Sequence, residues 1–107
     1  MRYYKYLYVS EDLKKKKDKI IQKLEQNKLQ LNIQLIVLPE SDHNQLEIVN
    51  SQILLQPAYP KKDLFVVGIV SSYEGALEFV EDIARDVYEN TAKADIRNYI
   101  LKKEQED

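Results

Sequence analysis

The longest uninterrupted apolar run in the chain spans residues 64–70. A strand without polar alternation is covered on both of its faces, so this run predicts a strand in the middle of a sheet. Ser71 follows at once, and Glu74 stands three residues later, which is the spacing of a helix capping box. From residue 76 to residue 88 apolar side chains recur at every third or fourth position, and acidic side chains fill the other side. The sequence therefore predicts a central strand that leads directly into an amphipathic helix.

The N-terminal part predicts two more strands with a helix between them. Residues 3–9 are rich in strand-favouring side chains and are largely apolar on both sides, so we expect a strand that is internal or half covered. Ser10 can cap a helix that runs to about residue 27, and residues 32–38 predict the next strand, which Pro39 ends. A strand, a long helix and a strand in succession predict a right-handed crossover that joins two parallel strands.

The middle of the chain is less clearly patterned. Residues 39–45 are polar and predict a loop. Residues 46–49 fit a short edge strand best, although their apolar spacing also suits a helix. Asn50 or Ser51 can cap a short helix, which Pro57 ends.

The C-terminal part completes the predicted fold. Residues 91–94 should end the long helix, Asp95 can cap a last short helix, and the charged tail over residues 101–107 is expected to fray. Together these elements predict one α/β domain over residues 1–107, with a mixed sheet of about four strands, two long helices on one face and a short C-terminal helix. A ferredoxin-like arrangement without its last strand and a small flavodoxin-like sheet both fit this order of elements.

Composition excludes several classes of chemistry. A chain of 107 residues can bury a core without disulfides, and it has no cysteine, which excludes thiolate catalysis and iron–sulfur ligation. No stretch approaches the roughly eighteen apolar residues of a membrane span, and the first residues lack the apolar segment of a secretory signal. We therefore expect a soluble cytoplasmic protein with no membrane contact. The net charge of −2 argues against a general nucleic-acid binder.

One pattern in the second half of the chain resembles a group of known proteins. It consists of Leu46-Glu47-Ile48, Ser51, Leu54-Leu55-Gln56-Pro57, Tyr59, Asp63-Leu64, Val66-Val67-Gly68-Ile69, Ala76-Leu77 and Val80. This pattern resembles that of small uncharacterised bacterial α/β proteins of unknown function, over roughly the C-terminal half and the first strand. The resemblance implies no activity, no catalytic residue and no cofactor.

The first candidate site is an edge of the predicted sheet. If the three predicted strands are mutually parallel, their carboxyl ends bring polar side chains to one edge, where open α/β sheets bind ligands. These side chains are Ser10, Glu40, Ser41, Asp42, His43, Ser71, Ser72 and Tyr73. Ser10, Ser71, Ser72 and Tyr73 are the candidate ligand-binding residues, because helix N-termini beside them offer N–H groups to a phosphate or carboxylate. The serines also have a purely structural interpretation as helix caps, and no glycine-rich nucleotide motif is present.

The single histidine gives little support for catalysis or for a metal site. His43 stands in a polar loop beside Asp42, whereas a metal usually needs three or four ligands and a catalytic histidine needs partners within reach. An exposed loop histidine is the default interpretation. We therefore predict no metal, no cofactor and no catalytic residue, and we keep a small hydrolase that uses His43 only as a weaker hypothesis.

The two long helices carry opposite charge. Residues 11–28 contain seven lysines and four acidic residues, whereas residues 72–91 contain six acidic residues and one arginine. If the helices lie side by side, this is complementarity between neighbours. If they do not, each is a patch that is available to a partner or to a second copy.

Tyr4, Tyr6 and Tyr8 alternate along the first strand and so share one face of the sheet. Because two helices can cover only one face, we expect this tyrosine row to be covered either by the C-terminal helix, through Ile96, Tyr99, Ile100 and Leu101, or by a second copy in a homodimer. The leading hypothesis is a non-enzymatic protein-interaction or regulatory module that self-associates. The alternative is a small-molecule or anion-binding protein that uses the sheet edge.

Overall fold

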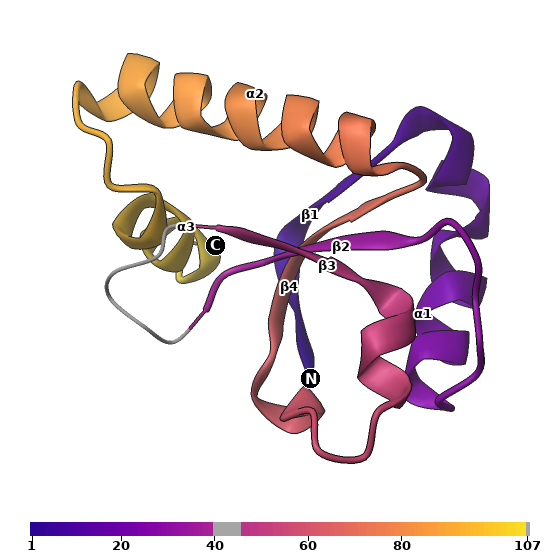
Figure 1. Ribbon diagram of the computed structural model, residues 1–107. Coiled ribbons are helices and arrows are strands. Elements are labelled where there is room, and N and C mark those ends of the chain that lie inside the picture. Colours follow the sequence, from indigo (N-terminus) through magenta and orange to yellow (C-terminus); the bar gives the residue numbers. More distant parts are fainter. Residues whose placement is uncertain (40–45, 107) are drawn as a thin grey trace.

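The computed structural model describes residues 1–39 and 46–106 and shows a single α/β domain with a four-stranded mixed sheet (Figure 1). The strands are β1 (Arg2–Val9), β2 (Gln34–Val37), β3 (Glu47–Asn50) and β4 (Phe65–Val70), and their order in the sheet is β1-β4-β2-β3. The described residues also form the α-helices α1 (Lys17–Glu25), α2 (Tyr73–Thr91) and α3 (Ile96–Glu104) and the 3₁₀ helices η1 (Glu11–Lys16), η2 (Ser51–Leu55) and η3 (Lys61–Asp63). The predicted class, with a mixed sheet, a short edge strand and a short C-terminal helix, is confirmed.

The direction of β2 differs from the prediction. β1 and β4 are parallel, whereas β2 is antiparallel to both β4 and β3. The predicted crossover between parallel first and second strands is therefore wrong. In both the ferredoxin-like and the flavodoxin-like arrangements the first two strands of the chain are parallel. In this sheet β1 and β2 run in opposite directions.

The reason for the reversal is the segment between α1 and β2, residues 26–33, which we call the return segment. It runs back beside the helix, and Gln30 Nε2 donates a hydrogen bond to the Ile20 carbonyl oxygen at 3.2 Å. Asn27 and Asn32 adopt positive φ angles of 56° and 60°, a conformation that asparagine tolerates better than most residues. β2 consequently starts at the end of the sheet where β4 stops, with Gln34 paired with Val70.

Helices cover both faces of the sheet. One cluster joins η1 and α1 to the first face, and its buried members are Leu13, Ile20, Leu24, Ile33, Leu35, Val37, Leu54, Val66 and Ile69. The other joins α2 and α3 to the opposite face, and its buried members are Tyr4, Ile36, Leu38, Phe65, Val67, Val70, Ala76, Ile83, Val87, Ile96 and Ile100. The expectation that both long helices share one face is therefore wrong. A strand that is apolar on both faces accepts a helix on either one, so the apolar run could not indicate this choice.

The predicted central strand is confirmed as β4, whose six residues are all buried. Gly68 lets β2 approach closely, since a Cβ atom there would lie 3.0 Å from Ile36 Cδ1. The following cap is shifted by one residue from the prediction. Ser72, not Ser71, caps α2, because its Oγ accepts a hydrogen bond from the Gly75 N–H at 3.0 Å. Ser71 is therefore not used as a helix cap.

β1 lies at one edge of the sheet, and α3 covers that edge. The Lys5 N–H donates to Glu104 Oε2 at 2.8 Å, and Lys5 Nζ donates to the Glu106 carbonyl oxygen at 2.7 Å. Asp95 caps α3 as predicted, since its Oδ1 accepts from the Asn98 N–H at 3.1 Å. The expectation of a frayed tail from residue 101 is corrected by these contacts, because α3 remains helical to Glu104. Covering an edge in this way protects it from pairing with other strands.

β3 forms the other edge, which confirms the strand assignment for this segment. Asn50 then caps η2 through its Oδ1, which accepts from the Gln52 N–H at 2.9 Å. Figure 1 shows α2 running along β2 and β3, with η2 on the other side of β3.

Candidate ligand-binding site

Two of the predicted residues do meet at one edge of the sheet. Because β1 and β4 are parallel, Ser10 after β1 and Ser71 after β4 lie at the same end, and the Ser10 N–H donates to the Ile69 carbonyl oxygen at 3.1 Å. The end of β2 points the other way, since the Leu38 N–H donates to the Phe65 carbonyl oxygen at the start of β4. The predicted members Glu40, Ser41, Asp42 and His43 follow that opposite end and lie outside the described residues.

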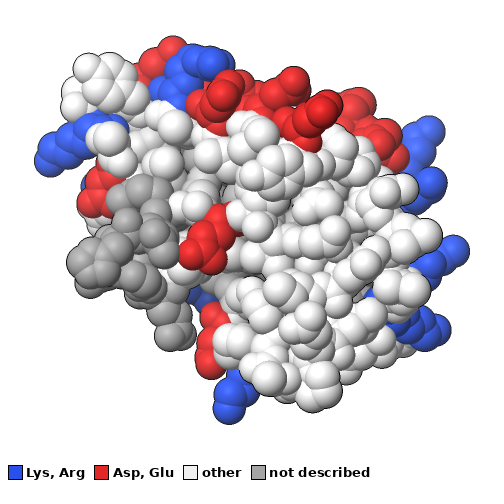
Figure 2. Space-filling view, in the orientation of Figure 1, with Lys and Arg blue, Asp and Glu red and all other residues white. Residues whose placement is uncertain are grey.

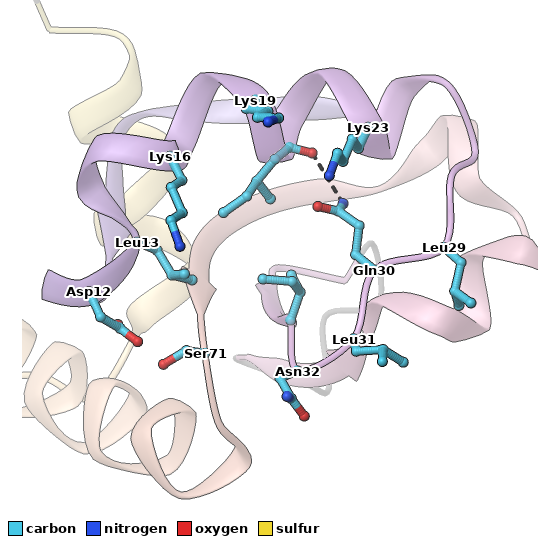
Figure 3. Close-up of a pocket in the computed structure, with 12 residues that line it drawn as sticks. Asp12, Leu13, Lys16, Lys19, Lys23, Leu29, Gln30, Leu31, Asn32 and Ser71 are labelled. Carbon is cyan, nitrogen blue, oxygen red and sulfur yellow. Dashed lines mark hydrogen bonds between the residues drawn. The ribbon is translucent and has the colours of Figure 1, made fainter.

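A pocket of about 770 Å³ opens beside this edge, between the η1–α1 helical segment and the return segment (Figure 3). This volume falls within the range of small-molecule sites in proteins. We call it the lysine pocket. Its lining residues are Asp12, Leu13, Lys16, Lys19, Ile20, Lys23, Leu29, Gln30, Leu31, Asn32, Ile33 and Ser71.

Three lysines form one wall of the lysine pocket. Lys16, Lys19 and Lys23 follow one another at the three- and four-residue spacing that puts side chains on one face of a helix. Figure 3 shows Lys16 and Lys23 reaching from the helix towards the return segment. Within residues 1–39 and 46–106, none of the three forms a salt bridge with a carboxylate. Lys16 and Lys23 therefore direct positive charge at the hollow, whereas Lys19 stays along the helix in this view.

Asp12 is the carboxylate of the pocket lining. The neighbouring hydroxyls of Ser71 and Ser10 hold the pKa of Asp12 below its usual range, and the charge of Lys16 contributes to the same shift. Asp12 is therefore ionised at neutral pH and offsets part of the lysine charge. The pocket remains net positive at its α1 wall.

The opposite wall is both apolar and polar. Leu29 and Leu31 are 62 % and 67 % exposed, a large exposure for leucine. Asn32 and Ser71 add polar groups at the lower side of the pocket in Figure 3. The arrangement offers ammonium groups to an anion and hydrocarbon to an apolar group beside it.

The predicted ligand-binding residues are thus divided by the structure. Ser71 lines the lysine pocket, whereas Ser10 is not a lining residue and its buried Oγ makes no capping hydrogen bond. Ser72 serves as the cap of α2, and Tyr73 is exposed at the start of that helix and is not among the lining residues. The purely structural interpretation therefore fits Ser72 alone among the three serines.

Sequence reasoning missed the lysines and the return segment. Four consecutive lysines, residues 14–17, spread around a helix and do not form one patch, but Lys16, Lys19 and Lys23 do share a face. That spacing was a usable signal. Leu29 and Leu31 carried no such signal, because their place opposite α1 depends on the reversal of the chain before β2.

The tyrosine row is covered within the chain, as one of the two expected alternatives holds. Tyr4 is only 3 % exposed and packs in the cluster that contains Ile96 and Ile100 of α3. Tyr8 is half-buried, its ring centroid lying 6.2 Å from that of Phe79, whereas Tyr6 remains 41 % exposed. Tyr4 and Tyr8 are therefore packed within the chain, whereas Tyr6 stays at the surface.

Burial of these tyrosines predicts a loss of stability at alkaline pH. Burial raises the pKa of Tyr4, with Tyr8 and Tyr99 adding to the shift, and burial also raises the pKa of Tyr8. A tyrosine whose pKa is higher in the folded state contributes stability that is complete below the ordinary tyrosine pKa of about 10 and is lost above it. We expect the free energy of unfolding of Tyr4→Phe to fall less steeply above that pH than that of the unaltered protein, by up to about 1.4 kcal/mol per pH unit.

Urea denaturation at about pH 8 and about pH 11 measures this difference. Equal losses in the two proteins between these pH values would contradict the prediction. The phenylalanine variant keeps the ring, so its stability at the lower pH serves as the control for packing.

The described residues show neither a metal-binding cluster nor a membrane-spanning helix, and the chain has no match among known proteins. Residues 1–39 and 46–106 contain no cluster of three or more histidine or acidic side chains that could hold a metal ion. Within the same residues, no helix combines the length and the hydropathy needed to cross a membrane. No protein-family model, curated protein or solved structure matches the chain. The resemblance to small bacterial proteins of unknown function stays a prediction.

Proposed function

We propose that the protein is a small non-enzymatic binding module and that the lysine pocket binds a ligand with a phosphate or carboxylate group. The observation that carries this proposal is the alignment of Lys16, Lys19 and Lys23 along one wall of a pocket large enough for a metabolite. Charge-assisted hydrogen bonds from ammonium groups are stronger than neutral ones, and the pocket supplies hydroxyl and amide groups from Ser71, Gln30 and Asn32 beside them.

The exposed leucines indicate that the ligand also has an apolar part. Leu29 and Leu31 stand across the pocket from the lysines, so a hydrocarbon chain attached to the anionic group would cover them. Removing this apolar surface from water favours binding by roughly 25 cal/mol per Å². A carboxylate on a short hydrocarbon chain satisfies both walls.

The same groups support binding rather than turnover. Most of the lining consists of ammonium, amide and hydrocarbon groups, and the Asp12 carboxylate and the Ser71 hydroxyl have no histidine among the lining residues to act with. The hydrolase hypothesis depends on His43, which lies outside the described residues. The lining residues therefore give it no support.

The test is a titration of the whole protein with octanoate, inorganic phosphate and neutral octanamide, followed by calorimetry and thermal unfolding. We expect octanoate to bind more tightly than octanamide, because only octanoate pairs with the lysines. A ligand at about ten times its Kd raises the free energy of unfolding by about 1.4 kcal/mol.

Lysine variants locate the site. Lys16→Met and Lys23→Met should each weaken octanoate binding about tenfold. Lys15→Met is the matched control, because Lys15 is exposed in the same lysine run but does not line the pocket. The proposal is wrong if no anion binds, or if Lys15→Met weakens binding as much as the pocket variants do.

Self-association as an interaction module is a second candidate, and it now depends on a different surface. The tyrosine row gives it less support, because α3 covers Tyr4 and Phe79 of α2 packs on Tyr8, which leaves Tyr6 as the exposed member of the row. An area with few charged residues beside β3 supports it instead (Figure 2).

A further inference from the structure

The two edges of the sheet differ in their cover. At the β1 edge, Lys5 donates hydrogen bonds to Glu104 of α3 and to the Glu106 carbonyl oxygen just after it, which covers that edge. At the other edge, β3 pairs with β2, and no second strand of the described residues pairs with it. An edge strand of this kind presents backbone groups that another strand can use.

Exposed apolar side chains gather on both sides of β3. On the α2 side these are Tyr73, Leu77 and Tyr88, which are 56 %, 42 % and 63 % exposed. Phe79 packs on Tyr8 of β1, so the helical spacing puts these three on the flank of α2 that is nearer to β3. On the η2 side, Ile53 and Leu55 are each 37 % exposed. We call this surface, from the α2 flank across β3 to η2, the β3 face.

The β3 face stands out from a surface that is otherwise rich in charge. Charged residues make up 32 % of the chain. Figure 2 nevertheless shows a broad area with few charged residues below the acidic row of α2, with acidic residues on its left side and basic residues at its right margin. Large uncharged areas with apolar side chains mark protein-protein contacts.

We infer that the β3 face binds a second copy of this chain, with the two β3 strands pairing antiparallel across a two-fold axis. A two-fold axis puts a strand residue opposite its own copy, so pairing centred on Ile48, whose backbone groups point away from β2, puts Ile48 opposite Ile48 and Glu47 opposite Val49, and no like charges meet within the strand pair. The same symmetry brings the α2 flanks together on one side of the joined sheet and the η2 helices together on the other. The chain thus supplies a partner whose surface matches its own.

The available area supports a stable contact. A standard interface covers about 800 Å² per partner. Each of the five exposed side chains removes on the order of 100 Å² from water when it is covered, so together they supply more than half of that area. Pairing of the two strands adds further contact along β3.

The salt dependence of association distinguishes this dimer from a second arrangement, in which the basic α1 of one copy binds the acidic α2 of another. In the β3-face dimer the acidic α2 helices of the two copies approach each other, so salt should strengthen association by screening their repulsion. Docking of the lysines of α1 on the acidic α2 of another copy would instead be weakened by salt. This inference is independent of ligand binding in the lysine pocket, which lies on the α1 side.

The experiment is sedimentation analysis of the full chain over a range of concentrations, at about 50 mM and about 500 mM salt. We expect a dimer whose Kd falls as salt rises. Leu77→Glu and Ile53→Glu, on the two sides of β3, should each raise the Kd at least about tenfold. Circular dichroism confirms that these surface variants are folded.

Tyr6→Glu is the matched control, because Tyr6 is exposed on the opposite edge strand. It should leave the Kd unchanged. A monomer at every concentration, weaker association at high salt, or a dimer that Tyr6→Glu breaks and Leu77→Glu does not, would overturn the inference. Amide exchange tests the strand pairing directly, since the N–H of Ile48, which points away from β2, should become more protected as the dimer forms.

Discussion

Replacing Ile83 with alanine should lower the free energy of unfolding by about 2–5 kcal/mol. Ile83 is fully buried near the middle of α2 and belongs to the cluster that joins this helix to the sheet. Truncation to alanine removes favourable burial and leaves a cavity that the surrounding strand and helix cannot fill completely. The effect is large because α2 is the longest helix of the described residues and depends on this apolar stripe for its attachment.

Chemical denaturation followed by circular dichroism measures the change. Glu78→Ala is the matched control, since Glu78 is exposed on the same helix and its replacement should change stability by no more than about 0.5 kcal/mol. Equal stability of the two variants would contradict the packing of α2 on β4.

Replacing Ile100 with alanine should also cost about 2–5 kcal/mol, and it tests the cover of the tyrosine row. Ile100 is fully buried in α3 and shares its cluster with Tyr4 and Phe65. A nine-residue helix has little stability of its own, so α3 depends on such contacts to stay on the sheet. Loss of the contact should loosen α3 and expose Tyr4.

The measurement combines denaturation with tyrosine fluorescence quenching by a neutral quencher. We expect Ile100→Ala to be less stable and to show more accessible tyrosines than the unaltered protein. Asn98→Ala, at an exposed position of the same helix, is the control and should change neither property. If Ile100→Ala were less stable but its tyrosines were no more accessible to the quencher, the prediction that α3 covers Tyr4 would be wrong.

These expectations depend on elements that local sequence patterns define well. The apolar run of β4 indicated a central strand because no polar side chain could face water on either side, and all six residues of β4 are buried. The cap of α3 at Asp95 also follows from local residue preferences, whereas the end of α2 at Ala92, whose φ is 56°, uses a conformation that alanine seldom adopts. The cap of α2 was misplaced by one residue, because Ser71 and Ser72 are equally suitable by residue type.

The lysine pocket shows where local patterns are insufficient. The spacing of Lys16, Lys19 and Lys23 is visible in the sequence, and Ser71 was a candidate from the start. Nothing in the neighbourhood of Leu29 and Leu31 indicates that the chain turns back along α1, since that path depends on two asparagines at positive φ and on contacts made far along the chain. One wall of the pocket was therefore predictable and the other was not.

The sequence by itself determined which segments are strands and helices, and which of their faces are apolar, because hydrogen-bonding geometry and burial give each element its own periodicity. Only the tertiary structure decided the antiparallel direction of β2, the separation of α1 and α2 onto opposite faces, and the use of α3 to cover Tyr4. The physical reason is that burial of apolar surface has no direction. A doubly apolar strand gains as much from a helix on one face as on the other, and the choice depends on the path of the whole chain.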